Sequence, residues 1–289
     1  MKYLVALLLC VRCAFCASII QGGGTKSVLG APPHYSFDDA QLLYHWTFDG
    51  RDITFLNTGA WTQTARVGAS ATMLGSAFNS GSFLTVMNNE MRPGVAGQGQ
   101  WMSGNQLCRV TNLNLSAVSL MTVSLWIKPS YVLTYNGDKM IIEGGVTDWS
   151  GQTNAIIIDT GDGSRDFTLG IRDSVNTSLL LTKTFKNTNT FPVSNVWYHC
   201  AFVFDNTTGA GNVKMFCNST NVTLTAGTST KTSAVGKFGN HYWSFFSRGT
   251  GALTLPTTTV DDLRIYTNEL TTAQLSEIYT NTAQWIKAP

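Results

Sequence analysis

Apolar and polar positions alternate over short runs along most of this chain, and breaks rich in Gly, Asn or Asp separate the runs. Alternation with a period of two is typical of strands with one buried face. Many short runs separated by turn residues predict an all-β, two-sheet antiparallel sandwich. The runs cover residues 41–48, 82–87, 121–129, 139–145, 155–159, 166–171, 196–205, 212–218, 241–247 and 260–266.

One segment near the end follows a helical period instead. In residues 267–283, apolar side chains recur at Leu270, Leu275 and Ile278, which a helix places on one face. Thr271 and Thr272 are candidate N-caps, and Gln274 stands three residues after Thr271, as a capping box requires. The pattern predicts one short C-terminal helix.

The first eighteen residues are typical of a secretory signal peptide. Lys2 precedes an apolar run over residues 3–11, and small residues suited to cleavage follow at 16–18. This run is too short to span a bilayer, and no later run is longer, so we expect a secreted, extracellular protein without membrane insertion. Residues 19–36 form a Gly- and Pro-rich leader, 37–282 a single domain and 283–289 a tail.

Charge is sparse in this chain. The formal net charge is +2 and 12% of residues are charged, against roughly 25% in typical soluble domains. This balance is too weak to indicate a nucleic-acid partner. Five N-glycosylation sequons predict that, in a eukaryotic source, glycans at some of them help to keep the surface soluble; which ones are used is left open among Asn114, Asn176, Asn206, Asn218 and Asn221.

Three of the six cysteines fall inside the predicted signal, which leaves Cys108, Cys200 and Cys217. The runs at 196–205 and 212–218 read as two strands of a hairpin. If Asp205 pairs with Asn212, Cys200 stands directly opposite Cys217, close enough for a disulfide. We therefore predict a Cys200–Cys217 bond, with Cys108 left over.

The sequence Asp159-Thr160-Gly161 follows three isoleucines, as the catalytic Asp of an aspartic protease does. Such proteases need two of these loops so that two carboxylates share a proton, and no second one occurs here. Gly161 and Gly163 lie between two strand-like runs, where a tight turn requires them. We interpret the stretch as a hairpin turn and not as a protease site.

Four stretches in a fixed order resemble one family. They are "LLYHWTFDG" (42–50), "MTVSLWIKP" (121–129), "NVWYHCAFVFDNTTGAGNVKMFCN" (195–218) and "VDDLRIYTNELTTAQLSEIY" (260–279). Together they resemble the laminin-G-like jelly rolls of the concanavalin A-like lectin and glucanase superfamily. The resemblance implies a two-sheet jelly roll and a secreted, non-catalytic recognition module that binds glycans or an extracellular glycoprotein.

Two alternatives to this recognition module remain open. The first is a glycoside-active enzyme of the same fold, although the Glu-x-Asp-x-Glu motif of the resembling glucanases is absent. The chain has four Glu in all, at 90, 143, 269 and 277, and none of them has the motif's spacing, so no catalytic residue is assigned. The second is a structural protein of an extracellular coat or matrix.

A calcium site is a further expectation. If Val260, Leu263 and Ile265 all face inward, their spacing requires a β-bulge at Asp261-Asp262. The resemblance implies a structural Ca²⁺ held by Asp261 and Asp262 together with the first strand, near Asp49. The alternative, equally open, is a carboxylate pair satisfied by backbone N–H groups and Arg264.

Aromatic residues divide between strands and loops. Trp46, Trp126 and Trp197 fall in strands and are expected in the core, and His199 is expected to pack beside Trp197. Aromatic rings in or beside polar loops complement the apolar faces of sugars, which makes ligand-binding candidates of Trp101, Trp149, Tyr242 and Trp243.

Overall fold

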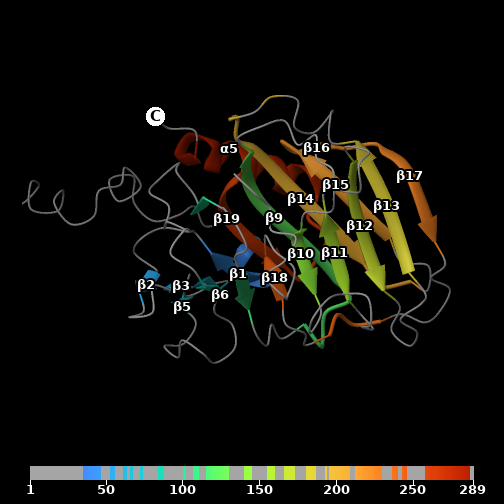
Figure 1. The fold of residues 1–289 in the computed structure, drawn as a ribbon, viewed down its shortest axis with the longest axis horizontal. Helices are drawn as coiled ribbons and strands as arrows, with labels where there is room; N and C mark the ends of the chain where they lie inside the picture. Colours follow the sequence, from blue (N-terminus) through green and yellow to red (C-terminus); the bar gives the residue numbers. More distant parts are fainter. Residues whose placement is uncertain are drawn as a thin grey trace, which may run out of the picture.

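The computed structural model describes residues 35–46, 53–55, 61–63, 66–67, 72–73, 84–87, 100–101, 107–110, 115–129, 140–144, 155–159, 166–172, 180–186, 193, 195–208, 212–229, 236–239, 243–245 and 258–286. In these residues the fold is two antiparallel sheets and two helices, as the alternating pattern predicts (Figure 1).

The nine-stranded sheet has the order β16-β15-β14-β9-β19-β1-β4-β5, and β7 also pairs with β19. It therefore joins the first strand to the last. Its strands are β1 (Leu42–Trp46), β4 (Arg66–Val67), β5 (Thr72–Met73), β7 (Gln100–Trp101), β9 (Leu120–Pro129), β14 (Tyr198–Asp205), β15 (Asn212–Cys217), β16 (Thr220–Asn221) and β19 (Thr258–Tyr266).

The ten-stranded sheet has the order β17-β13-β12-β11-β10-β18-β8-β6-β3-β2. Its strands are β2 (Ile53–Phe55), β3 (Trp61–Gln63), β6 (Leu84–Met87), β8 (Leu107–Val110), β10 (Met140–Gly144), β11 (Ile156–Asp159), β12 (Asp166–Arg172), β13 (Leu180–Lys186), β17 (Leu224–Ser229) and β18 (Trp243–Phe245). In Figure 1, β10 to β13 lie in front of β9, β14 and β19, which shows the two layers.

The main core lies between the two sheets. One cluster of buried side chains joins residues of both layers, among them Val123 and Phe202 from one sheet and Ile158 and Ile171 from the other. Successive side chains of a strand point to opposite faces, so every second residue of these strands enters this core.

A second core lies on the far side of the nine-stranded sheet, under helix α5 (Thr272–Ile286). Leu275 and Ile278 of α5 pack against Val203 and Phe216 of the sheet. The predicted capping box is present. Thr271 Oγ1 accepts the backbone N–H of Gln274 at 3.2 Å, and Gln274 Oε1 accepts the backbone N–H of Thr271 at 2.9 Å.

The amino-terminal end of the described chain packs beside α5 on the outer face of the nine-stranded sheet. Tyr35 is buried beside α5 and stacks on Phe37, and the short helix α3 (Asp38–Gln41) leads into β1. The packed structure thus includes Tyr35, inside the segment predicted as leader, and α5 runs to Ile286, past the predicted domain end at 282.

Candidate functional site

A β-bulge interrupts β19 at the place where the sequence predicts one. Asp261 pairs with Trp126 of β9 and Arg264 pairs with Ser124, so three steps on β19 match two on β9. Asp262 has a φ of 51°, in the left-handed region that Asp tolerates better than most residues. The bulge lets Leu263 join the core between the sheets while the side chain of Arg264 points to the opposite face, toward Tyr35 and Asp38.

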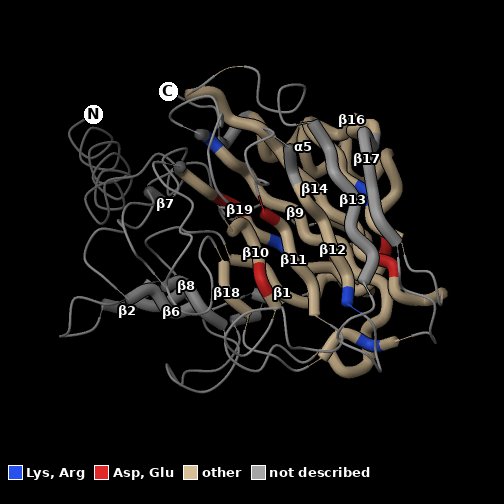
Figure 2. Tube along the Cα trace, turned by 45° about the vertical axis from the view of Figure 1, so that its right-hand side comes forward, with Lys and Arg blue, Asp and Glu red and all other residues tan. Residues whose placement is uncertain are grey.

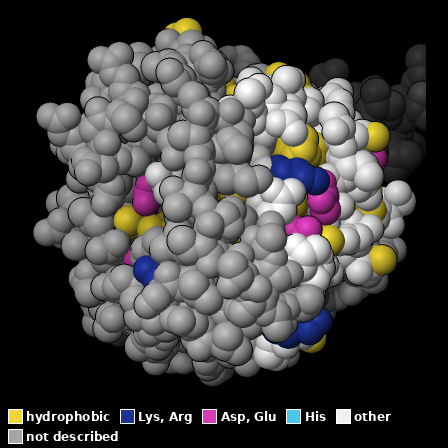
Figure 3. Space-filling view, turned by 90° about the vertical axis from the view of Figure 1, so that its right-hand side faces the viewer, with side chains coloured by type: hydrophobic (Ala, Val, Ile, Leu, Met, Phe, Trp, Pro, Cys, Tyr) yellow, Lys and Arg dark blue, Asp and Glu magenta, His cyan; other side chains and the backbone are white. Residues whose placement is uncertain are grey.

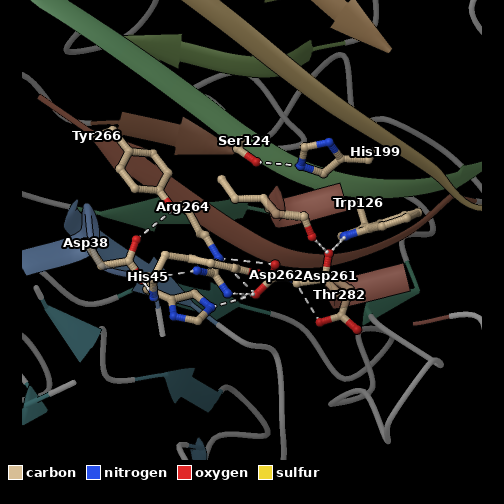
Figure 4. A network of polar contacts seen from close by, with 12 residues as sticks. Asp38, His45, Ser124, Trp126, His199, Asp261, Asp262, Arg264, Tyr266 and Thr282 are labelled. Carbon is tan, nitrogen blue, oxygen red and sulfur yellow. Dashed lines mark hydrogen bonds and ion pairs between the residues drawn. The ribbon is translucent and has the colours of Figure 1, made fainter. Parts of the chain in front are cut away.

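The bulge organises a buried network of charged side chains (Figure 4). Arg264 lies at its centre and donates from Nη2 to Asp262 Oδ1 at 3.1 Å and from Nε to Asp262 Oδ2 at 3.2 Å. On its other side, Arg264 Nη1 lies 3.6 Å from Asp38 Oδ2. His45 Nε2 lies 2.6 Å from Asp262 Oδ1, and Tyr266 donates its hydroxyl to Asp38 at 3.2 Å. The network therefore ties the start of the domain to its last strand.

Burial and charge shift the pKa values of these groups in a consistent way. Burial alone would raise the pKa of Asp262, but Arg264 and His45 lower it well below its usual range. Burial, and then Arg264, lower the pKa of His45 and outweigh the effect of Asp262. Asp262 is thus a carboxylate, Arg264 a cation and His45 a neutral ring at neutral pH.

This arrangement matches the alternative to calcium that the sequence left open. Arg264 binds the Asp262 carboxylate, and Asp261 Oδ1 accepts the backbone N–H of Asp262 at 2.8 Å. The fully buried guanidinium beside Asp262 would repel a second cation at that carboxylate, which weighs against calcium there. Asp49 lies outside the described residues, and no group of three acidic, His or Cys side chains in the described part could hold a metal ion. Calcium at Asp261 stays a prediction, which melting with and without chelator tests.

A second buried polar group lies between α5 and the same sheet. His199 Nε2 is 2.8 Å from Ser124 Oγ, and Trp126 donates its indole N–H to Thr282 Oγ1 of α5 at 2.9 Å. The ring of Tyr279 stacks on Trp126. His199 is thus a packed residue, as predicted, and buried Trp46, Trp126 and Trp197 confirm the expected core tryptophans.

The aromatic ligand candidates have mixed outcomes. Trp243 was expected beside a loop, but it lies in β18 with an exposed fraction of 0% and belongs to the core. That prediction was wrong because Trp243 belongs to a strand in which the alternate rings, Trp243 and Phe245, both enter the core. Trp101 lies in β7, which pairs with β19, and its side chain is not described. Trp149 and Tyr242 lie outside the described residues.

The structure brings together polar residues that the sequence kept apart, on the face of the ten-stranded sheet turned away from the core. Ile156, Ile158, Leu169 and Ile171 enter the core, so the alternate residues of β11 and β12 point outward. Glu143 opposes Ile157, which opposes Gly170, and Asp159 opposes Thr168. We call this set the β10–β12 outer surface: Glu143, Asp159, Thr168, Gly170 and Arg172.

The accessibility of the β10–β12 outer surface varies along it. Thr168 and Arg172 are half-buried, whereas Glu143 and Asp159 are 1% and 7% exposed. Gly170, between Thr168 and Arg172, contributes no side chain, and a glycine inside a strand permits close approach of another molecule. Ser244 opposes Glu143 in β18, and within the described residues its buried hydroxyl makes no hydrogen bond. Gly170 and its partner Ile157 lie between these polar groups and are buried as well.

Sequence reasoning placed Glu143 in a segment unrelated to other acids and overlooked Ser244. The available signal was a charged residue inside an otherwise apolar run, "MIIEGG". The interpretation of Asp159 as part of a hairpin is confirmed, since β11 and β12 pair directly on either side of residues 160–165. Asp159 itself is the last residue of β11.

The hairpin register predicted for the cysteines is confirmed. Asp205 pairs with Asn212, and Cys200 stands directly opposite Cys217. The two are not joined by a disulfide in this structure, so the bond itself stays a prediction. Burial raises the pKa of Cys200 well above its usual value, which keeps this thiol protonated and slow to react. The side chain of Cys108 is not described.

Three of the five predicted glycosylation residues are described, and they differ. Asn206 is fully buried, a position that does not fit a glycan in this fold. Asn218 is half-buried and Asn221 is exposed. Asn114 and Asn176 lie outside the described residues.

The described surface carries few charges. Figure 2 shows charged residues widely spaced along the described strands, and on the described part of the face in Figure 3 positive and negative side chains lie beside one another. The pair Lys214–Glu269, at 2.5 Å, is one such neutralised contact. Among the described helices, none has the length and apolar character needed to cross a bilayer.

The sequence of this chain was compared with models of protein families and with curated protein sequences. The family model described as the concanavalin A-like lectin/glucanases superfamily matches residues 102–276, more than half of the chain. A search of curated protein sequences finds no match.

Similar solved structures include binding domains of botulinum neurotoxins. That of type DC, solved in complex with SialylT, is 13% identical with a TM-score of 0.53, over 86% of this chain and 52% of that one. That of serotype C1 is 13% identical with a TM-score of 0.50, over 86% and 53%. The DC domain with rat synaptotagmin II is 14% identical with a TM-score of 0.50, over 74% and 50%. The aligned region spans about half the length of these domains, and the likeness shows the fold.

Proposed function

Since this chain belongs to the concanavalin A-like lectin/glucanase superfamily, we propose that it is a secreted, non-catalytic recognition module that binds glycans, free or on an extracellular glycoprotein. The observation that carries the proposal is the family match over residues 102–276. Two similar solved structures are binding domains in complex with SialylT and with synaptotagmin II, and this use of the fold for binding supports the proposal. Fold alone does not determine function, so the site chemistry must support it.

The β10–β12 outer surface supplies chemistry suited to a sugar. Carboxylates accept hydrogen bonds from hydroxyl groups, and Arg172 and Thr168 can donate to ring and hydroxyl oxygens. Gly170 leaves room for the sugar ring to approach the strand. We expect the ligand to lie over Gly170, between Thr168 and Arg172, with Asp159 beside it.

The proposal is tested by a glycan array on the purified chain, once with calcium and once with chelator. For the glycan that binds best, titration should show at least tenfold weaker binding for Gly170→Val, which adds a branched side chain between Thr168 and Arg172, and for Asp159→Asn. The loss matches removal of one hydrogen bond to a charged group, about 1.5–3 kcal/mol.

Glu277→Gln is the matched control, because it removes one carboxylate from the exposed face of α5. It should leave binding unchanged. Absence of binding to every glycan on the array would contradict the proposal. Equal loss in the control and test variants would contradict the placement of the site.

One observation favours the second candidate, a glycoside-active enzyme. Asp159 lies two residues beyond Ile157, the partner of Glu143, so both carboxylates stand on one face of neighbouring strands. Diagonal neighbours on adjacent strands lie about 7–8 Å apart, close enough for their carboxyl groups to reach the roughly 5–9.5 Å separation of glycosidase pairs. Release of reducing sugar from the bound glycan, abolished in Glu143→Gln and Asp159→Asn alike, would establish the enzyme instead.

A further inference from the structure

Three sequons lie along the β14–β15–β16 strands of the nine-stranded sheet, with Asn206 directly after β14 and with Asn218 and Asn221 at the opposite end of β15. Their surroundings differ. We propose that Asn221 carries an N-linked glycan when this chain passes through a eukaryotic secretory pathway, whereas Asn206 and Asn218 stay unmodified. The inference rests on the secretion stated in the proposed function, and it does not depend on which ligand the module binds.

Asn206 cannot carry a glycan in this fold. Its side chain is 0% exposed, and its backbone is held on both sides, because its N–H donates to Ser119 at 2.7 Å and its carbonyl accepts from Gly236 at 3.1 Å. An N-linked glycan is bulky and hydrophilic and requires a surface position. A chain with a glycan at Asn206 could not bury this residue or form its backbone hydrogen bonds to Ser119 and Gly236, so we expect the folded protein to be unmodified there.

Asn218 is held by its turn. Asn218 and Ser219 have φ values of 49° and 63°, and they link the paired residues Cys217 and Thr220, which defines a two-residue hairpin of type I′. The Asn218 side chain is half-buried, and its Oδ1 accepts the backbone N–H of His199 at 3.0 Å. A sugar would be attached at Asn218 Nδ2, next to the Oδ1 that accepts from His199, and would place a large group against β14.

Asn221 has the opposite surroundings. It is exposed, it lies in β16 at the edge of the nine-stranded sheet, and Thr220 and Thr223 beside it are exposed as well. No strand of the described chain pairs with the free edge of β16. A glycan at Asn221 can therefore extend into solvent from this edge without displacing a packed side chain. It would also shield an edge that could otherwise pair with another strand.

The test is site occupancy in the full chain secreted from eukaryotic cells. Treatment with peptide N-glycosidase in heavy-oxygen water converts each occupied Asn to a labelled Asp, and peptide sequencing by mass spectrometry locates the label. We expect the label at Asn221 and unlabelled Asn at 206 and 218. A label at Asn206 or Asn218, or its absence from Asn221, overturns the inference.

Variants separate attachment from folding. Asn221→Gln and Thr223→Ala both destroy the sequon of Asn221, and each should remove one glycan from the intact mass while leaving the melting temperature within about 2 °C. Thr220→Ala destroys the sequon of Asn218 and should leave the mass of the attached glycans unchanged. Loss of a glycan in Thr220→Ala, or none in Thr223→Ala, contradicts the assignment. Array binding by the enzymatically deglycosylated chain tests the proposed function separately.

Discussion

At the scale of single residues, Arg264 is the side chain on which the buried network depends. It is fully buried and is the cation for two carboxylates, Asp262 of its own strand and Asp38 of α3. Its guanidinium also lies 5.0 Å from the centre of the Tyr35 ring. Removal of one member of a buried ion pair leaves the other charge without compensation in a medium that solvates it poorly.

We therefore expect Arg264→Met to lower the free energy of unfolding by about 3–5 kcal/mol, measured by urea denaturation. Lys214→Met breaks the half-exposed pair with Glu269 and is the matched control, with an expected loss of at most about 1 kcal/mol. Similar losses in the two variants would show that Arg264 does not hold the network together.

His45 makes stability depend on pH. Its pKa in the folded state lies below the usual 6.5, so the unfolded chain takes up a proton first as the pH falls. The contribution of His45 is complete above pH 6.5 and is lost below it. We expect the melting temperature to fall between pH 7 and pH 5, and His45→Gln to flatten this dependence. An unchanged slope in His45→Gln would refute the assignment.

At the scale of elements, the β14–β15 hairpin places two thiols in register. The backbone N–H of Asn218 donates to the carbonyl of His199, and this pattern makes Cys200 and Cys217 a non-hydrogen-bonded pair. The Cα atoms of such a pair lie about 4.5 Å apart, within the range that a disulfide spans.

We expect oxidised glutathione to join Cys200 and Cys217, with release of two equivalents of reduced glutathione. Peptide mapping without reductant should show the linked peptide. The bond should raise the free energy of unfolding by about 3 kcal/mol for a loop of this length. Cys217→Ser should remove both effects, and two free thiols after oxidation of the unmodified protein would contradict the prediction.

At the scale of the whole molecule, α5 covers the outside of the nine-stranded sheet. Ala201, Val203, Phe216 and Tyr266 face away from the main core and are buried because α5 and the segment at Tyr35 lie over them. The jelly roll thus has three layers where α5 is present: helix, sheet and sheet.

A chain that ends after Thr271 should expose this apolar face. We expect it to bind a hydrophobic dye strongly and to elute as aggregates in size-exclusion chromatography. A chain that ends after Ile286 keeps α5 and should behave as the full chain does. A monomeric, dye-free product from the shorter chain would show that the sandwich is complete without the helix.

The sequence by itself determined the class of fold, the β14–β15 register, the bulge at Asp261-Asp262 and the cap of α5. Each of these depends on contacts between residues close in sequence or on a strict period of apolar residues, and both can be recognised in the sequence alone. β13 and β17 escaped prediction because few of their residues are apolar and they lie at or next to the sheet edge, where alternation is weak.

Only the tertiary structure decided which groups meet across long separations. Asp38 and His45 reach Arg264 and Asp262 because β1 pairs with β19, more than two hundred residues later. The same holds for Glu143 beside Ser244, and for the burial of Asn206 and Trp243. The sequence around a sequon or an aromatic residue does not show whether that residue is on the surface or in the core, because burial depends on which other segments cover it.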